Sequence, residues 1–395
     1  MVYLTRPTMK HFFLSVALLL IFSIAYSQAV TSLNFSHWYN PKNEVDLRLY
    51  LVRGQKNVAI YYELKTPLTV SSGYTISWEK RDSYNTREGA NVTDQDSILL
   101  TEPNRKTGSI KFDLPAKPWI LLAKVTHTES QRSWYYFKLI ESIYPVTGWL
   151  ENSSGVLMEH YLTRGKSYAV KNIDSKPLFV SYYETVFPQP YPPFTDKGGH
   201  AEKFLFHDSV FQIASGNSFI PKQKGLYLFQ QDTTAADGFT FRVVNETYPK
   251  FNSIDDLTGP LIFITTPEEY KQILAVKGDK PTFDKIILDI TRDKDRAKNL
   301  MRSYFQRVEL ANKYFSSFKE GWKTDRGMIY TIFGVPDELG KNAGNEVWTY
   351  KTSGARFTFV KSGSVYDPEN FVLLRDKRFT EAWFSTIDLW RKSRF

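Results

Sequence analysis

The residues best suited to acid–base chemistry in this sequence are two short charged pairs. Asp325 and Arg326 form one, and Asp337 and Glu338 form the other. Carboxylates that flank a common substrate can act as general acid and general base. Both pairs, however, lie where turns demand short side chains that accept hydrogen bonds from backbone amides. We therefore interpret them as capping and turn residues, and we predict no catalytic residue and no enzyme.

Two histidines lie near carboxylates in the middle of the chain. His200 and His207 are close in sequence to Glu202 and Asp208. Imidazole and carboxylate groups can bind a metal, but this spacing fits no established metal-site template. The sequence also lacks a phosphate-binding glycine-rich loop, a Gly-x-Ser-x-Gly elbow and a His-Glu-x-x-His motif. We predict neither a metal nor a cofactor.

The most particular residue order is Gly321-Trp322-Lys323-Thr324-Asp325-Arg326-Gly327. It precedes the apolar run Met328–Phe333, which we interpret as a strand because β-branched and aromatic residues predominate. Gly321 suits the left-handed position that ends a helix, and Trp322 can bury a large aromatic surface. Thr324 and Asp325 can bond nearby backbone amides. The junction is therefore predicted to join a helix to a strand.

The same segment contains further residues that serve as structural anchors. Gly327 allows a tight backbone entry into the predicted strand, which ends at a turn. Val335 is held extended by the proline that follows it, and Asp337 can close the turn. The anchors that follow the heptapeptide are Tyr330, Gly334, Pro336 and Asp337.

Helical periodicity dominates on both sides of this junction. A helix is predicted from Thr266, where a capping-box pattern stands, and a longer one from Asp293. The longer helix carries one apolar stripe: Leu300, Tyr304, Val308, Ala311, Phe315 and Phe318. The segments Glu346–Tyr350 and Arg356–Val360 are predicted to form a hairpin with Met328–Phe333. A terminal helix is predicted within Glu381–Phe395.

Residues 28–250 carry the alternation typical of antiparallel strands. We predict two Ig-like β-sandwich modules, residues 28–145 and 146–250, with Trp78, Trp119 and Trp134 in the first core. The fold class is thus multidomain, with two antiparallel β-sandwiches followed by an α+β domain at 251–395. Within the second sandwich, Phe187–Phe194 contains four prolines and must form an extended loop. This loop either folds back on its own domain or presents an aromatic ridge to a partner.

The composition and the N-terminal segment limit which cellular compartment and which partners are compatible with the sequence. A basic start, an apolar run from Phe12 to Ala25 and Ala25-Tyr26-Ser27 predict a signal peptide at 1–27, and therefore export. No later segment is apolar enough to span a membrane. The absence of cysteine excludes disulfides, thiol nucleophiles and a diacylglyceryl anchor. Of the formal charge of +9, Arg6 and Lys10 supply two units, and residues 277–395 supply the remaining excess of seven basic residues, as a solubilising face or a contact with an anionic partner. Nucleic acid is not expected.

Residues Asp289–Glu338 resemble the GWxTD-domain family, exported proteins of Gram-negative bacteria. The resemblance rests on the heptapeptide, on Arg307, Ala311 and Phe315, and on Tyr330, Gly334, Pro336 and Asp337. It implies a bacterial envelope protein and brings no established reaction. A weaker, architectural similarity is to the small lipoprotein subunit of the outer-membrane barrel assembly machinery, because a helix, a strand ending in Gly-x-Pro-Asp and aromatic strands follow one another.

Two functions remain open from the sequence. The first is a non-enzymatic scaffold or accessory protein, periplasmic or peripheral to the outer membrane, that binds an envelope protein complex in outer-membrane protein assembly or secretion. The second is a periplasmic enzyme or a glycan-binding protein with a site near Trp322–Asp337. The candidate partner-binding residues are Phe187, Tyr191 and Phe194 in the proline-rich loop, and Arg391, Lys392 and Arg394 at the C-terminal end.

Overall fold

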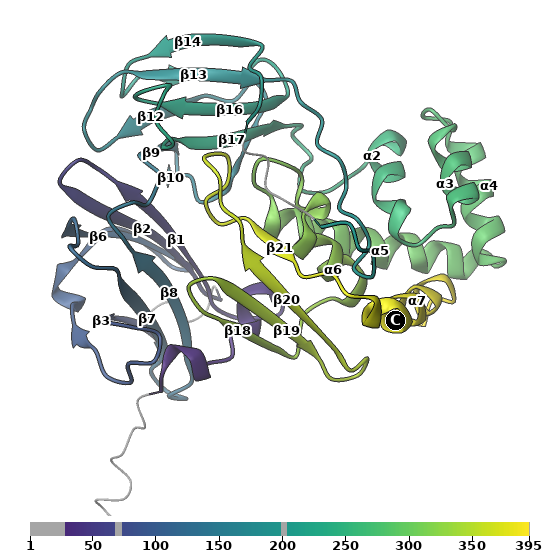
Figure 1. The fold of residues 1–395 in the computed structure, drawn as a ribbon, viewed down its shortest axis with the longest axis horizontal. Helices are drawn as coiled ribbons and strands as arrows, with labels where there is room; N and C mark the ends of the chain where they lie inside the picture. Colours follow the sequence, from purple (N-terminus) through teal and green to yellow (C-terminus); the bar gives the residue numbers. More distant parts are fainter. Residues whose placement is uncertain (1–27, 68–72, 199–203, 395) are drawn as a thin grey trace, which may run out of the picture.

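The computed structural model describes residues 28–67, 73–198 and 204–394. Figure 1 shows two β-rich parts and a mixed C-terminal part that meet around a common centre. The predicted signal peptide at 1–27 lies outside the described residues. The fold class predicted from the sequence is confirmed.

The first part is an antiparallel β-sandwich of two four-stranded sheets. One sheet has the order β1 (Asp46–Arg53), β2 (Asn57–Lys65), β6 (Arg105–Asp113), β5 (Asp96–Glu102). The other has the order β4 (Ala90–Asn91), β3 (Tyr74–Arg81), β7 (Trp119–His127), β8 (Ser133–Ile140). Trp78, Trp119 and Trp134 are all buried in its core, as predicted. The prediction missed β5, because most of its residues are exposed and it therefore lacks apolar alternation.

The second part pairs a four-stranded and a five-stranded sheet. The smaller sheet has the order β10 (Gly155–Val156), β9 (Gly148–Asn152), β12 (Tyr168–Asn172), β15 (Ser218–Phe219). The larger has the order β11 (Tyr161–Thr163), β17 (Phe239–Val244), β16 (Gly225–Gln230), β13 (Leu178–Tyr183), β14 (Ser209–Ile213). All their pairings are antiparallel except that of β11 with β17. Because β14 stands last in the strand order, it forms one edge of the larger sheet.

The C-terminal part begins with the helices α2 (Ile254–Thr258), α3 (Pro267–Leu274), α4 (Lys280–Thr291), α5 (Lys294–Phe315) and α6 (Asp325–Phe333). It ends with helix α7 (Thr380–Arg391). Thr266 forms the predicted capping box with Glu269. Asp293 caps α5, accepting a hydrogen bond from the Arg296 amide at 2.8 Å. The predicted apolar stripe from Leu300 to Phe315 is buried and faces a single core, whereas Phe318 lies beyond the end of α5 and packs in a separate cluster with Phe187.

A small antiparallel sheet completes this part, with the order β18 (Glu338–Lys341), β19 (Asn345–Tyr350), β20 (Ala355–Lys361), β21 (Phe371–Leu373). The predicted hairpin of β19 and β20 is present, but its neighbour is β18. Met328–Phe333 is the body of helix α6, so the predicted strand is wrong. Most residues of α6 are buried, and a continuous apolar run of this length fits a buried strand as well as a buried helix.

The segment ahead of the first sandwich joins it to the C-terminal part. It contains two short 3₁₀ helices, Val30–Ser32 and Ser36–Tyr39. The Phe35 amide donates to the Leu339 carbonyl at 2.8 Å, and the Phe35 ring packs edge-on against Phe137 of β8 at 5.1 Å. The Tyr330 hydroxyl donates to the Tyr39 carbonyl at 2.8 Å. Within the part of the chain that the structure describes, no helix has the length and apolarity to cross a bilayer.

Candidate functional site

The two glycines of the heptapeptide permit close backbone contact. Gly321 begins a 3₁₀ turn, Gly321–Lys323, and does not adopt the predicted left-handed conformation. A Cβ on Gly321 would lie 2.0 Å from the Ala311 carbonyl oxygen of α5. A Cβ on Gly327 would lie 1.8 Å from the Gly321 carbonyl oxygen. Both positions therefore exclude a side chain because other backbone atoms occupy its space.

Thr324 and Trp322 fix the local path of the chain. The Thr324 hydroxyl accepts from the Gly327 amide at 2.9 Å and donates to the Gly321 carbonyl at 2.7 Å. Thr324 is thus the N-cap of α6. Trp322 is 5% exposed and packs edge-on against Phe263 at 5.8 Å between ring centroids. The predicted burial of Trp322 and the backbone role of Thr324 are confirmed.

Asp325 is tied to a distant segment. Its carboxylate accepts from the Leu373 amide at 2.7 Å and pairs with the Arg375 guanidinium at 2.6 Å. Both members of this ion pair are buried. The prediction that Asp325 bonds nearby amides is wrong, because the start of α6 faces β21 and the residues after it. Asp325 holds the last strand of the sheet against the motif.

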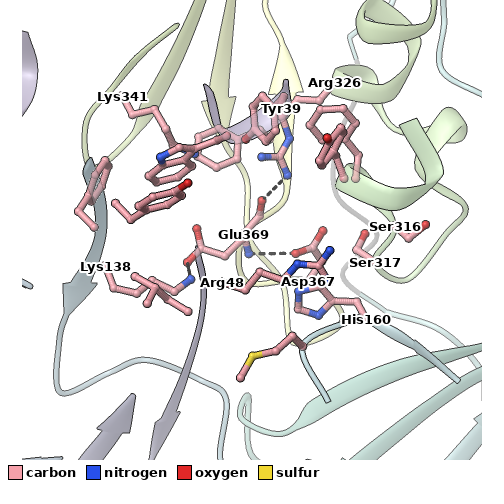
Figure 2. A pocket seen from close by; sticks show the side chains of 18 of the residues that line it. Tyr39, Arg48, Lys138, His160, Ser316, Ser317, Arg326, Lys341, Asp367 and Glu369 are labelled. Atoms are coloured by element: carbon pink, nitrogen blue, oxygen red, sulfur yellow. Dashed lines mark hydrogen bonds and ion pairs between the residues drawn. The ribbon is translucent and has the colours of Figure 1, made fainter. Parts of the chain in front are cut away.

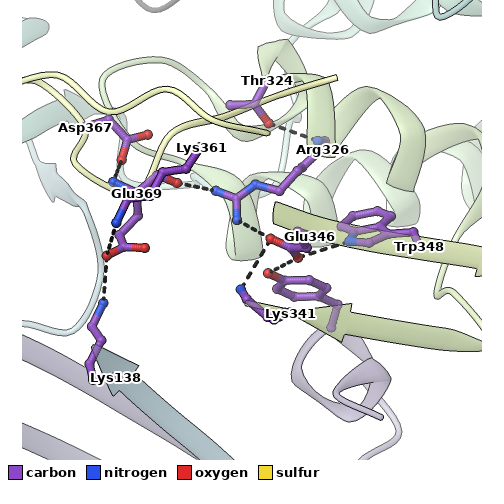
Figure 3. A network of polar contacts seen from close by, with 11 residues as sticks. Lys138, Thr324, Arg326, Lys341, Glu346, Trp348, Lys361, Asp367 and Glu369 are labelled. Carbon is purple, nitrogen blue, oxygen red and sulfur yellow. Dashed lines mark hydrogen bonds and ion pairs between the residues drawn. The ribbon is translucent and has the colours of Figure 1, made fainter. Parts of the chain in front are cut away.

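Arg326 belongs to a buried charge network, shown in Figure 3. Its guanidinium pairs with Glu346 at 3.2 Å and donates to the Glu369 carbonyl at 3.0 Å. Glu346 is 0% exposed and also accepts from the Tyr39 hydroxyl at 2.8 Å and the Trp348 indole at 3.0 Å. Lys341 approaches Glu346 at 3.3 Å.

The network sets the charge states of its members. Burial acts to raise the pKa of Glu346, but Lys341 and Arg326 hold that pKa below its ordinary value. Burial lowers the pKa of Lys341 despite the attraction of Glu346. Burial opposes the charge of Arg326 as well, yet Glu346 raises its pKa above the ordinary value. These groups stabilise one another and leave Glu346 without contact to solvent.

The remaining anchors serve the end of α6 and the turn after it. Gly334 has a φ of 83°, the left-handed region that favours glycine, and its carbonyl accepts from the Tyr350 hydroxyl at 2.8 Å. Pro336 is buried. The Asp337 carboxylate accepts from the Lys351 amide at 2.7 Å, directly after β19, so the bond joins Asp337 to a distant segment and does not close the predicted local turn. Asp337 is exposed whereas Asp325 is buried, so the two carboxylates do not face a common substrate.

A cavity of about 290 Å³ lies where the three parts meet (Figure 2). Arg48 and Lys138 reach it from the first sandwich, and His160 from the second. Lys313, Asp367 and Glu369 line it from the C-terminal part. Of the motif residues, Arg326 also borders it. The sequence analysis singled out none of these residues except Arg326, because they come from segments far apart in the chain.

Several of the cavity's charges are paired with one another. Arg48 binds Glu159 at 2.7 Å and Asp46 at 3.4 Å. Glu369 lies 3.5 Å from both Lys138 and Lys361. Burial opposes the charge of Glu369, but the surrounding cations, Lys138 foremost, lower its pKa to about 2.

Other charged groups of the cavity lack such a counter-ion. Among the described residues, no ion pair is formed by Lys313, His160 or Asp367. Burial raises the pKa of Asp367, whose carboxyl accepts from the Glu369 amide at 3.0 Å. The position of His160 deep between the three parts lowers its pKa, although Asp367 opposes that shift. The His160 side chain is nevertheless exposed, because it faces the space of the cavity.

Residues 225–392 match the family model of the GWxTD domain. The chain carries a GWxTD domain. The match begins at β16 of the second sandwich and ends directly after α7. It includes the heptapeptide, the charged members of the network and the C-terminal residues that border the cavity. No curated protein matches the chain.

Two titin structures are among the solved structures with some similarity to this chain. A titin substructure has 13% identity and a TM-score of 0.18, and it covers 50% of this chain and 97% of its own. A chimeric titin Z1Z2 carrying an exogenous peptide from decorin has 13% identity and a TM-score of 0.19, with coverage of 51% and 95%.

The proline-rich loop packs onto the α+β part of the GWxTD domain. Phe187 is buried edge-on against Phe318 at 4.8 Å, and Phe194 contacts Phe384 at 5.2 Å. The Tyr191 carbonyl accepts from Arg375 at 3.0 Å, while its side chain stays exposed. The loop therefore folds onto a different part of the chain from the sandwich that carries it. Two of its three candidate contact residues are occupied by internal packing.

The C-terminal cations differ in their contacts. Arg391 pairs with Glu269 of α3 at 2.7 Å, and Lys392 pairs with Asp388 at 2.6 Å. Arg394 is exposed. Arg391 thus links α7 to α3, which leaves Lys392 and Arg394 as the outward-facing candidates.

The histidines considered for a metal site are only partly described. His200 and Glu202 lie outside the described residues. His207 is exposed, and the Asp208 carboxylate accepts from the Glu184 amide at 2.8 Å. In the ranges that the structure covers, no group of three or more histidine, aspartate or glutamate side chains could hold a metal ion.

Proposed function

We propose that this protein is a non-enzymatic scaffold of the bacterial cell envelope, periplasmic or peripheral to the outer membrane, that binds a partner protein in outer-membrane protein assembly or secretion. The predicted signal peptide and the GWxTD domain support the compartment. The internal use of Thr324, Asp325 and Arg326 supports a structural role for the motif. One observation carries the proposal: an unprotected apolar sheet edge at β14.

β14 lies at the edge of the larger sheet of the second sandwich (Figure 1). Its sequence includes three apolar residues. Four of its five residues are exposed, among them Val210 and Phe211. Just before the strand, Phe204 and Phe206 are 89% and 98% exposed. Large aromatic side chains this open to solvent are uncommon on a monomeric surface and indicate an interaction site when they cluster.

A second exposed edge provides an internal reference. β5 of the first sandwich carries Ile98 and Leu99, which are also exposed. Its pairing with β6 is interrupted by a register shift between Ile98 and Leu100, and it begins with Asp96 and ends with Glu102. Bulges and charged ends protect an edge strand against pairing with other chains. β14 pairs with β13 without interruption and contains no charged residue and no proline.

The partner that fits this edge is an extended, apolar segment of an envelope protein. Such a segment can add a strand to β14, using main-chain hydrogen bonds for affinity and alternate side chains for specificity. The exposed phenyl rings of Phe204 and Phe206 lie next to the edge in sequence and would cover the partner's apolar side chains. The architectural similarity to the barrel-assembly lipoprotein does not support this mode, because its predicted strand is helix α6.

Site-specific crosslinking tests this proposal. A photo-crosslinking amino acid is placed at Val210 in cells of the native host, and the matched control carries it at Leu99 on the protected edge. We expect a discrete adduct with one envelope protein from Val210 and none from Leu99. Val210→Lys, which places a charge on the edge, should abolish capture of the same protein by an affinity-tagged chain. Absence of any adduct at Val210, or identical adducts at both positions, contradicts the proposal.

A further inference from the structure

The cavity between the three parts lies away from the β14 edge and has the properties of a small-molecule site. Its volume of about 290 Å³ is close to the lower limit of roughly 300 Å³ for ligand pockets. A space of this size accommodates a ligand about as large as a monosaccharide derivative. Aromatic walls are present as well, including Tyr39, Tyr136 and Tyr314, and aromatic walls with a few convergent polar groups are typical of binding sites.

The groups that face this space define the chemistry of a ligand. Lys313 is exposed and has no carboxylate partner among the described residues, and an ammonium group offers donors only. Asp46, Arg48 and Glu159 lie near it, and both of these carboxylates are already paired with Arg48. The cavity therefore offers a cation that lacks a counter-ion. An anionic group on a ligand would supply the missing counter-ion.

The opposite requirement comes from other residues that line the same cavity (Figure 2). Asp367 and Glu369 present carboxyl oxygens there, and His160 presents an imidazole that can donate or accept. A fully deprotonated anion such as sulfate has no hydrogen to donate to carboxylates. A ligand that also carries hydroxyl groups can donate to Asp367 or Glu369 and still accept from Lys313 and His160.

We propose that this cavity binds a small hydroxylated anion of the sugar-acid or sugar-phosphate class, with its anionic group at Lys313 and its hydroxyls toward His160, Asp367 and Glu369. Because residues of all three parts line the cavity, the ligand would contact each of them at once. The site is separate from β14, so a failure of either proposal leaves the other standing.

Calorimetric titration of the purified mature chain tests the site. The probes are glucuronate, glucose 6-phosphate and neutral glucose. We expect saturable binding of at least one anionic probe and binding at least about tenfold weaker for glucose, since a hydrogen bond to a charged group contributes roughly this factor. A preference between the two anions distinguishes a carboxylate from a phosphate ligand. Absence of binding by both, or equal binding of glucose, overturns the proposal.

Matched variants locate the binding. Lys313→Gln removes the unpaired cation at nearly constant volume, and Lys285→Gln removes an exposed cation of α4 that does not line the cavity. Affinity for the anionic probe should fall about tenfold in the first variant and stay unchanged in the second. His160→Gln should also weaken binding. Equal affinities in all three variants and the unaltered chain would place the ligand elsewhere and overturn the proposal.

Discussion

The motif junction and the central cavity are both rich in charged groups, but their charges have different partners. At the junction, Asp325 pairs with Arg375 at 2.6 Å and Arg326 with Glu346 at 3.2 Å, all within the protein. In the cavity, Lys313 and His160 face open space without an ion pair among the described residues. The carboxylates of the junction thus have cationic partners within the protein, whereas Lys313 and His160 in the cavity have no such ion pair among the described residues.

This difference shows that the most distinctive residue order in the sequence does not mark the candidate ligand site. The junction needs fixed residue types because backbone atoms and buried charges leave no room for alternatives. The cavity needs only that several side chains converge, and each of them is unremarkable in its own segment. A distinctive motif therefore marks the scaffold here, whereas the candidate ligand site is assembled by the fold.

The largest effect should come from the backbone contact at the junction. Gly327→Ala places a methyl group 1.8 Å from the Gly321 carbonyl oxygen, which requires backbone displacement. We expect the free energy of unfolding to fall by more than about 4 kcal/mol, the range of severe steric defects. Urea unfolding followed by tryptophan fluorescence measures it. Gly340→Ala is the control because no atom lies within 4 Å of its added Cβ; equal stability of both variants would refute the close-contact argument.

The buried carboxylate of the network should have the next largest effect. Glu346→Gln leaves Arg326 and Lys341 buried without an anionic partner, and breaking a buried ion pair costs about 3–5 kcal/mol. The exposed pair of Glu338 with Lys351 provides the control, since Glu338→Gln should cost at most about 1 kcal/mol.

A pH series checks the same carboxylate. Because the folded-state pKa of Glu346 lies below its ordinary value, its contribution is present at neutral pH and is lost as the pH falls through that lower pKa. The Gln variant should therefore lose less stability than the unaltered chain on acidification. A parallel loss in both would show that Glu346 does not contribute in this way.

The half-buried His37 predicts a smaller effect of pH. Burial lowers the pKa of His37 from 6.5 to about 4, and its ring nitrogen lies 3.0 Å from the Tyr135 carbonyl. The neutral form is favoured in the folded state, so stability is fully present above pH 6.5 and declines as the pH falls toward 4. His37→Gln should flatten the stability curve in this window. The exposed His207 serves as the control, and an unchanged slope in His37→Gln would contradict the assignment.

How far the sequence predicts these regions depends on the range of the interactions. The stripe of α5 from Leu300 to Phe315 and the capping box at Thr266 are local patterns, and both are confirmed. Helix α6 was missed because nearly every residue of it is buried, which removes the periodicity that distinguishes a helix from a strand. Gly321 was assigned to a helix end because nothing in the sequence reveals the approach of the Ala311 carbonyl.

The cavity could not be predicted from local sequence patterns either, because its residues are far apart in the chain. Arg48, His160 and Lys313 come from a strand, a connection and a helix in three different parts of the chain. Each is an ordinary surface residue in its own segment, and only the packing of the parts brings them together. The basic surplus after Lys277 is a bulk property and does not single out Lys313.

The smallest effect on stability should come from the cavity, and it decides whether the contrast with the junction holds. Lys313 is exposed and without an ion pair among the described residues, so Lys313→Gln should change the free energy of unfolding by no more than about 0.5 kcal/mol. The same urea titration as for Gly327→Ala and Glu346→Gln measures it. If Lys313→Gln destabilises the chain as much as Glu346→Gln does, the cavity charges maintain the fold as the junction charges do, and the contrast between the two regions is wrong. If stability is retained while affinity for the anionic sugar falls, the Lys313 charge serves a ligand and not the fold.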